Sequence, residues 1–370
     1  KPSDNTAKHR GNELIIMSTP SIDSILPEAP RSPRWQHSLR DAVRDVHELL
    51  EILELDPLDA DWLQPGTDEF PVLIPRSFIS RMRKGDPTDP LLLQVLPARG
   101  ERAEHEGFTK DPLLEVPLAQ AGVIEKYPSR ALLVTTSACP VHCRYCFRRH
   151  FPYEAQLASR NDWADALTAL KRSAGIREVI LSGGDPLSLS NRRLRRLVSE
   201  LETVGSITTV RIHSRFPIVL PERVDRELLA LLRQTRLRTV LVVHCNHANE
   251  IDESVSSALQ QISATGTTLL NQSVLLHGIN DDVDCLESLS YRLFESGVLP
   301  YYLHGLDRVA GAAHYQVEDT TALQLIADLR TRVPGYLVPQ LVREIPGELS
   351  KTPLPASDPP QKSSVTPARS

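Results

Sequence analysis

Three cysteines with spacing suited to metal chemistry directly follow the apolar run at 130–136. They stand in a C-x₃-C-x₂-C arrangement and are Cys139, Cys143 and Cys146. Thiolates are soft ligands that suit iron–sulfur clusters, zinc or copper(I). A closed zinc site or an ordinary [4Fe–4S] cluster takes four protein ligands, so three thiolates would leave one iron with an open coordination position. The alternatives are a zinc knuckle completed by His142 or His150, and a chance grouping.

Polar residues also stand at the ends of later apolar runs. Gly183 and Gly184 end the run at 177–183 and are followed by Asp185, and glycines there let the backbone approach a ligand closely. An ordinary strand–helix turn is the alternative interpretation. His244 and Gln272 lie in further runs and could face a ligand, or they could be satisfied core groups.

The elements that would position these residues alternate regularly along the chain. Six apolar, strand-like runs stand at 130–136, 177–183, 208–214, 239–245, 267–276 and 300–306. Helical patterns follow them near 161–174, 190–203, 223–235, 249–265, 282–297 and 319–333. Such alternation predicts an α/β fold with a parallel sheet, and six units rather than eight predict an open, partial (β/α)₆ barrel. Chemistry in such barrels collects at the carboxyl ends of the strands, where the cysteines stand.

The rest of the chain divides by composition. A helical pattern runs from Trp35 to Leu53 and a second helix is expected at 77–84. The predicted parts are a disordered extension at 1–32, a helical accessory domain at 33–115, the barrel at 116–335, a lysine-bearing segment at 336–355 and a disordered tail at 356–370.

Composition limits the partners and the compartment. The 42 basic and 47 acidic residues give a net charge of −5, so we expect neither nucleic acid nor an anionic membrane as a partner. Five cysteines are an odd number, and three lie together, which favours metal chemistry in a reducing cytoplasm over disulfides. No apolar run reaches the roughly 18 residues of a membrane span.

The cysteine spacing resembles the signature of radical S-adenosylmethionine (SAM) enzymes, whose open iron binds SAM. The glycine pair resembles the loop that holds the SAM amino group. Further motifs then occur in order: Lys126-Tyr127 with Arg130, Arg148 after the cysteines, SGGDPL at 182–187, Asp307, and SKTP at 350–353. Together they resemble lysine 2,3-aminomutase, a radical SAM enzyme that also uses pyridoxal 5′-phosphate (PLP), over roughly residues 35–355.

The resemblance implies cofactor roles. The three cysteines would hold a [4Fe–4S] cluster, and Lys351 would carry PLP through its amine, although an exposed terminal lysine is the alternative. Gly183, Gly184 and Asp185 are implied to bind SAM, and His244 and Gln272 could point toward its adenosine or toward the substrate. Residues implied to bind the PLP phosphate are Tyr127, Arg130 and Lys126. The family has arginine where this chain has Lys126, which loses bidentate geometry.

The resemblance also implies a substrate. Arg148 would bind the substrate carboxylate through its planar guanidinium. Asp307 and Glu344 would bind the side-chain ammonium of lysine, and Glu344 stands where the family usually has aspartate. The implied reaction moves the α-amino group of lysine to C3, with an external one-electron reductant for the cluster.

Residues 75–97 and the short segment after Lys351 resemble the bacterial enzyme that makes (R)-β-lysine for modification of elongation factor P. Elongation factor P and its lysyl ligase are therefore implied partners. The alternatives are a catabolic lysine or glutamate 2,3-aminomutase, a radical SAM enzyme of another class without PLP, and a non-catalytic metal-binding module.

Overall fold

Parallel strands form the centre of one sheet, and neighbours in the sheet are also neighbours in the sequence. The computed structural model describes residues 34–56, 70–120, 122–153, 163–173 and 175–354. Parallel pairing joins β3 Arg130–Thr136, β4 Glu178–Gly183, β5 Thr209–Ser214, β6 Arg238–Val243, β7 Thr268–Val274, β8 Leu299–His304 and β9 Gln340–Arg343. Antiparallel strands border them: β1 Ala119–Gln120, β2 Val123–Tyr127 and β10 Thr352–Pro353. The prediction of an α/β fold with a partial barrel is confirmed.

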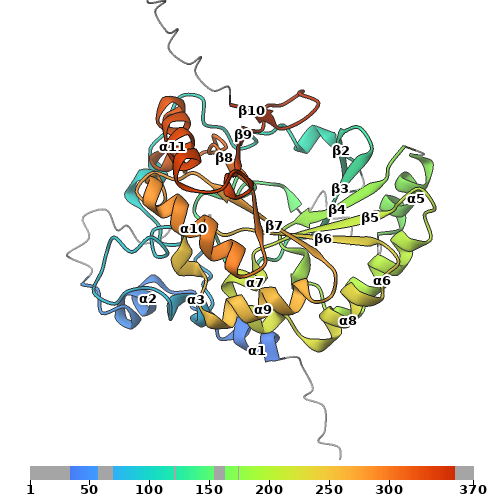
Figure 1. Ribbon diagram of the computed structural model, residues 1–370, viewed down its shortest axis with the longest axis horizontal. Helices are drawn as coiled ribbons and strands as arrows, with labels where there is room; N and C mark the ends of the chain where they lie inside the picture. The colour runs from blue at the N-terminus through green and yellow to red at the C-terminus, as the bar shows by residue number, and fades with distance from the viewer. Residues whose placement is uncertain (1–33, 57–69, 121, 154–162, 174, 355–370) are drawn as a thin grey trace, which may run out of the picture. The chain divides into compact units, whose positions relative to one another are not determined.

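Helices follow the strands and pack on the outer side of the curved sheet (Figure 1). They are α5 Ala164–Arg172, α6 Asn191–Glu202, α8 Arg226–Gln234, α9 Glu253–Ser263, α10 Val283–Glu295 and α11 Asp319–Arg332. Four begin at a residue whose side chain accepts hydrogen bonds from first-turn amides: Ser190, Asp225, Asp252 and Asp282. Each helix buries an aliphatic face, as Leu194, Leu197 and Leu201 do in α6.

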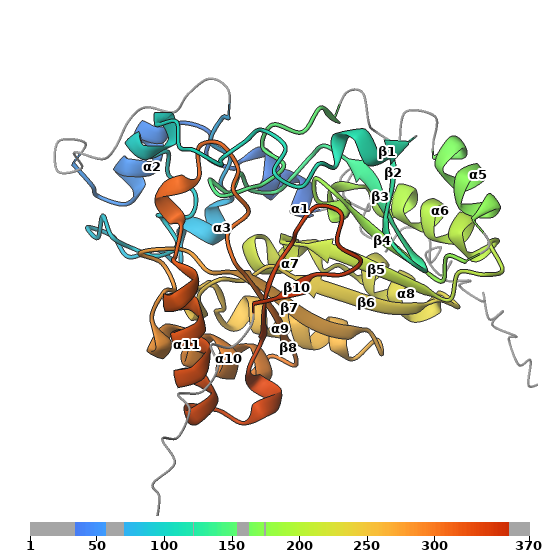
Figure 2. The ribbon, with the colours of Figure 1, turned by 90° about the horizontal axis from the view of Figure 1, so that it is seen from above.

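The C-terminal segment belongs to the sheet, which the prediction of six strands missed. β9 pairs in parallel with β8, and β10 turns back antiparallel onto β9 with Thr352 opposite Arg343. Strands of four and two residues are too short to give a recognisable apolar run. In both views the loop between β9 and β10 extends toward β2, so it lies over the carboxyl ends of the strands (Figures 1 and 2).

The N-terminal part is less helical than predicted. The expected helix from Trp35 to Leu53 is broken into α1 Arg34–Arg40 and α2 Val46–Ile52. The break arises because Val43 and Ile74 exchange two backbone hydrogen bonds of 2.9 Å, which takes Val43 out of a helical conformation. The second predicted helix is one turn, α3 Arg76–Ile79.

This N-terminal part shares one core with the barrel. A single cluster of buried side chains contains Trp35, Phe78 and Leu92 together with Leu181 and Leu241 of the sheet. From Arg34 onward the chain forms one compact unit. The boundary at 115/116 stays a prediction, and the extensions at 1–32 and 356–370 lie outside the described residues.

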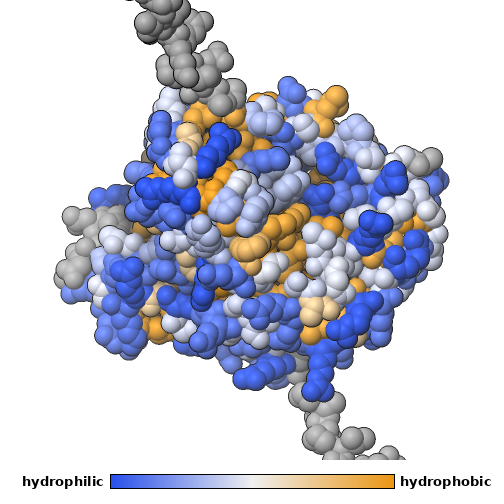
Figure 3. All heavy atoms as spheres, in the orientation of Figure 1, coloured by the Kyte–Doolittle hydropathy of each residue, from blue (hydrophilic) through white to orange (hydrophobic). Residues whose placement is uncertain are grey.

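Side chains on the strands alternate between the helices and the inside of the sheet, as the two-residue period of a strand requires. On β5, Val210 and Ile212 are buried under the helices, whereas Arg211 and His213 line an internal cavity. On the face seen in Figure 1, hydrophilic residues dominate the margins and hydrophobic ones lie across the middle (Figure 3). The inward set of side chains forms the candidate site.

Candidate active site

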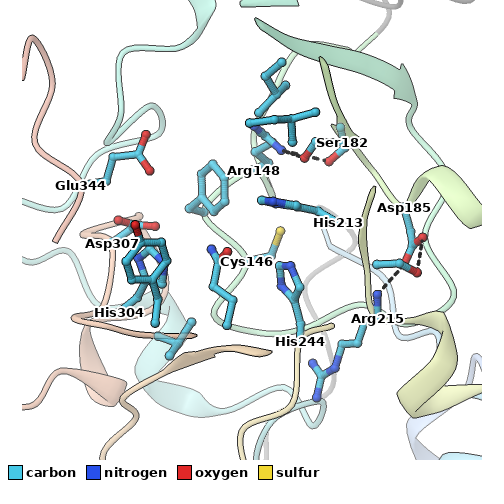
Figure 4. A pocket seen from close by; sticks show the side chains of 18 of the residues that line it. Cys146, Arg148, Ser182, Asp185, His213, Arg215, His244, His304, Asp307 and Glu344 are labelled. Atoms are coloured by element: carbon cyan, nitrogen blue, oxygen red, sulfur yellow. Dashed lines mark hydrogen bonds between the residues drawn. The ribbon is translucent and has the colours of Figure 1, made fainter. Parts of the chain in front are cut away.

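One cavity lies at the carboxyl ends of the parallel strands. It brings together residues that are far apart in the sequence, such as Tyr127 and Lys351. Every residue predicted for the site lines it except Lys126, whose side chain lies outside the described part of the structure. The lining members are Tyr127, Arg130, Cys139, Cys143, Cys146, Arg148, Gly183, Gly184, Asp185, His244, Gln272, Asp307, Glu344 and Lys351. Figure 4 shows ten lining side chains labelled.

The loop that bears the cysteines leaves β3 and is held by the N-terminal part. The amide of Arg144 donates to the backbone carbonyl of Gln94 at 2.9 Å, and the amide of His142 donates to the carbonyl of Leu73 at 3.0 Å. The buried guanidinium of Arg144 forms an ion pair with Glu101, its Nε lying 2.8 Å from Oε1. These contacts tie the cysteine loop to the N-terminal part.

The two histidines of the zinc-knuckle alternative are engaged elsewhere. His142 Nδ1 lies 2.7 Å from the carbonyl of Pro71, and its ring stacks on Phe70. His150 Nε2 lies 3.3 Å from the carbonyl of Ala310. Within the described residues, no three Cys, His, Asp or Glu side chains converge on a position for one metal ion. The contacts of the two histidines do not support a zinc knuckle, whereas a cluster would use the three thiolates, each on a different iron.

The surroundings of the thiols suit a bound cluster. Burial raises the pKa of Cys139 well above its usual value and that of Cys146 to about 11. Thiols in such a place ionise when a metal binds them. Arg148 and Arg215 supply positive charge beside them, and Arg215 Nη1 lies 2.6 Å from Cys143 Sγ.

The glycine pair packs closely against the cysteine loop, and its predicted contact with SAM stays a prediction. A Cβ on Gly184 would stand 2.5 Å from the carbonyl oxygen of Ala138, and one on Gly183, where φ is +107°, would stand 2.8 Å from that of Thr136. The amide of Gly184 donates to Thr136 at 2.7 Å. The close approach that needs glycine is therefore to the backbone of the cysteine loop, which packs against the end of β4.

Asp185, which is predicted to belong to the SAM-binding loop, binds protein donors through its carboxylate. Its carboxylate accepts from Ser214 Oγ at 2.8 Å and from the amides of Arg215 and Leu187 at 2.7 and 3.0 Å. Burial raises its pKa to about 6. Both oxygens bind protein donors, so Asp185 joins the end of β4 to the end of β5 and positions the residues there.

Arg148 lies deep in the cavity with a partner already bound. Its Nε and Nη2 donate to the two oxygens of Glu115 at 2.7 and 3.0 Å, and its Nη1 donates to Ser182 Oγ at 2.9 Å. The sequence analysis did not single out Glu115 because an isolated acid before the barrel carries no motif. A substrate carboxylate can bind the Nε–Nη2 edge of Arg148 only if Glu115 moves.

Lys351 meets Glu344 across the hairpin formed by β9 and β10. Its Nζ lies 2.7 Å from Glu344 Oε2, and both side chains are largely buried. Burial and the neighbouring Glu344 carboxylate raise the pKa of Tyr127. The guanidinium carbon of Arg130 lies 4.7 Å from the centre of the Tyr127 ring. The Nε of Arg130 is buried with no hydrogen-bond partner in the described residues. An orphaned cationic donor near a lysine suits a phosphate-bearing carbonyl cofactor.

Three histidines face the same space. Nε2 of His213, His244 and His304 is buried and has no hydrogen-bond partner among the described residues. Burial lowers the pKa of all three, that of His244 to about 4, so the imidazoles are neutral. Asp307 and Glu344 lie on the His304 side of the pocket in Figure 4. The sequence analysis named only His244, although His213 and His304 also stand at strand ends.

The described residues contain no helix that is both long and apolar enough to cross a membrane.

The chain is similar to known proteins over nearly its whole length. Residues 133–282 match the family model described as the radical SAM superfamily. The chain is 46% identical to "L-lysine 2,3-aminomutase" of Escherichia coli (strain K12), over 92% of this chain and 97% of that protein. It is 43% identical to the protein of that name from Haemophilus influenzae, covering 89% and 98%, and 32% identical to that from Clostridium subterminale, covering 86% and 77%. The chain therefore belongs to the L-lysine 2,3-aminomutase family, a family of isomerases within the radical SAM superfamily.

Proposed function

We propose that the protein converts L-lysine to (R)-β-lysine with the help of a [4Fe–4S] cluster, SAM and PLP. The observation that carries this proposal is the convergence, in one cavity, of the three cysteines, Lys351 and the acid pair Asp307 and Glu344. When bound, the cluster and SAM supply one-electron hydrogen abstraction, and PLP supplies a carbonyl carrier for the amino group. The chain's own residues bind, orient and exclude water.

The cofactor end of the cavity supports PLP. Lys351 Nζ is 5.8 Å from the centre of the Tyr302 ring and is the one predicted nucleophile there. Among the described residues the Nε of Arg130 has no hydrogen-bond partner and could bind an anion, and the guanidinium packs on the Tyr127 ring. These contacts fit a phosphate bound near Tyr127 and a carbonyl bound at Lys351.

The acid pair supports a cationic substrate side chain. In the structure Glu344 neutralises the Lys351 ammonium at 2.7 Å. With PLP held at Lys351, the Glu344 carboxylate would be available to the ammonium of a substrate. A substrate side chain that ends in an ammonium, as lysine does, restores the balance of charge beside Asp307, whereas the carboxylate of glutamate would worsen it.

The substrate comparison tests this assignment. Removing one carboxylate leaves the buried ammonium under-compensated, at roughly 2–5 kcal/mol for a fully buried pair. We expect Asp307→Asn to lower kcat/KM for lysine about a hundredfold, on the order of 3 kcal/mol, with iron and PLP content unchanged. Wild-type turnover of glutamate as fast as lysine, or a variant with full lysine activity, would show that these acids do not select the substrate.

The higher identity to the E. coli and H. influenzae proteins than to the clostridial one supports the subfamily implied by residues 75–97. The product would then serve elongation factor P and its lysyl ligase, in the cytoplasm, with a cellular one-electron reductant. Deletion of the gene should remove β-lysine from elongation factor P in the source bacterium, as intact-mass analysis would detect. Elongation factor P that keeps β-lysine in the deletion strain would contradict this role.

A further inference from the structure

Arg215 directs a buried guanidinium at one of the three cysteine thiols. It follows β5 directly and is 6% exposed. Its Nη1 lies 2.6 Å from Cys143 Sγ and 2.7 Å from the hydroxyl of Tyr145. Its Nη2 donates to Gln94 Oε1 at 2.7 Å and to Glu250 Oε2 at 3.1 Å. Both terminal nitrogens therefore have assigned partners.

The partners of Arg215 are themselves held. Glu250 is fully buried and its other oxygen accepts from the amide of Asn246 at 2.8 Å and from Gln94 Nε2 at 3.1 Å. Asn246 Nδ2 also donates to the hydroxyl of Tyr145 at 2.6 Å. The network joins segments that follow β5 and β6 to the cysteine loop and the N-terminal part. Its members leave the guanidinium little freedom to turn away from the sulfur.

The main chain of Arg215 is fixed as well. Its amide donates to Asp185 at 2.7 Å, as the dashed line in Figure 4 shows. The same carboxylate accepts from Ser214, the residue before it. The glycine pair in turn packs the segment before Asp185 against the cysteine loop. Asp185 thus fixes the main chain of Arg215, and the glycine pair fixes the cysteine loop, so both groups are held in place.

The chemistry of a cluster gives this contact a consequence. Reduction adds one electron from an external donor and takes a [4Fe–4S] cluster from the 2+ to the 1+ state, so its sulfur ligands become more electron-rich. Hydrogen bonds to cluster sulfurs and the local charge set the reduction potential. A fixed cation that donates to a ligand sulfur stabilises the reduced state more than the oxidised state, and burial strengthens the effect.

We propose that Arg215 is a tuning residue that makes the cluster easier to reduce by donating a hydrogen bond to the Cys143 thiolate. The proposal rests on the proposed function only in that the three cysteines hold a [4Fe–4S] cluster. The carboxylate of Glu250 lies on Nη2, away from the sulfur, and offsets part of the positive charge. Its removal should therefore act in the opposite direction to removal of Arg215.

The test is a redox titration of the reconstituted holoprotein in the absence of SAM. Electron paramagnetic resonance measures the reduced cluster at each potential. The variants are Arg215→Gln, Arg215→Lys and Glu250→Gln. The matched control is Arg223→Gln, because Arg223 is also buried but donates to the carbonyls of Leu187 and Leu189. Iron and sulfide are counted in every sample, so that only loaded protein is compared.

We expect Arg215→Gln to lower the ratio of reduced to oxidised cluster at a fixed potential at least tenfold, which is 59 mV for a one-electron couple. Arg215→Lys should fall between it and the wild type, Glu250→Gln should raise the ratio, and Arg223→Gln should leave it unchanged. A loaded Arg215→Gln protein that reduces like the wild type would overturn the proposal, even if it bound SAM more weakly. If Arg215→Gln does not load, a Glu250→Gln ratio at or below the wild-type value overturns it.

A wild-type protein that binds no cluster would contradict the proposed function instead.

Discussion

Lys351 is paired with Glu344 and largely buried, which supports the proposal that PLP attaches to its amine. We expect borohydride reduction of the PLP-loaded protein to fix the cofactor to the peptide that contains residue 351. Peptide mass mapping measures this, with Lys351→Ala as the control that should lose the label. Labelling of another lysine in the wild type would move the PLP site away from the β9–β10 hairpin.

His244 gives the protein a dependence of stability on pH. Burial, with the nearby cations Arg215, Lys351 and Arg148, lowers its pKa from 6.5 to about 4. The unfolded chain binds a proton below pH 6.5 that the folded chain does not bind until about pH 4. The stability that neutral His244 contributes is therefore complete above pH 6.5 and is lost as the pH falls toward 4.

Thermal unfolding without SAM at pH 7.5 and pH 5.0 measures this effect. Between pH 7.5 and pH 5.0, the free energy of unfolding of the wild type should fall by about 2 kcal/mol more than that of His244→Asn, because asparagine does not titrate. Asp185, whose raised pKa of about 6 acts in the opposite direction, is present in both proteins and cancels in the comparison. Equal losses in the two proteins would show that His244 is not buried in its neutral form.

At the scale of elements, the turn after β4 supports the cysteine loop. A methyl group at Gly184 would meet the backbone of Ser137 and Ala138 at 2.7 and 2.5 Å, so the loop must shift. We expect Gly184→Ala to destabilise the protein by about 1–3 kcal/mol and to reduce iron content after reconstitution. Gly205→Ala is the matched control because nothing lies within 4 Å of its added carbon. Full iron loading of Gly184→Ala would contradict the role of this turn.

The sequence predicted the elements that are long and apolar. The runs at 130–136 and 239–245 recur as β3 and β6 to within two residues at each end, because buried parallel strands are nearly continuous in Val, Ile and Leu. β9 and β10 were missed because they are stabilised by pairing with β8 and with each other, not by an apolar pattern. The break between α1 and α2 likewise depends on Ile74, a distant residue.

The site was predicted where a motif stood and missed where only the fold brings residues together. The cysteines were found by their spacing, Asp307 and Lys351 were found through the family resemblance, and all line the cavity. Arg215 and Glu115 were not, since one contacts Cys143 and the other Arg148 only after folding. His213 could have been found by the rule that selected His244, because both stand at the carboxyl end of a strand.

At the scale of the whole molecule, the cavity wall combines three parts of the chain. The cysteine loop follows the first parallel strand, the histidines stand at later strand ends, and Lys351 and Glu344 arrive on the β9–β10 hairpin. The N-terminal part holds the cysteine loop through Gln94 and shares the core of the barrel. In the proposed function, radical generation belongs to the cysteine loop and amino-group migration to the β9–β10 hairpin, and both line the same cavity.

The most direct test of this account is turnover by the protein after anaerobic reconstitution with iron and sulfide. Lysine is supplied with SAM, PLP and dithionite, and the products are separated by chiral chromatography and mass spectrometry. The account predicts (R)-β-lysine, formed only when all three additions are present and absent from Cys143→Ala and Lys351→Ala. A loaded protein that cleaves SAM but leaves lysine unchanged, or that forms β-lysine without PLP, would contradict it.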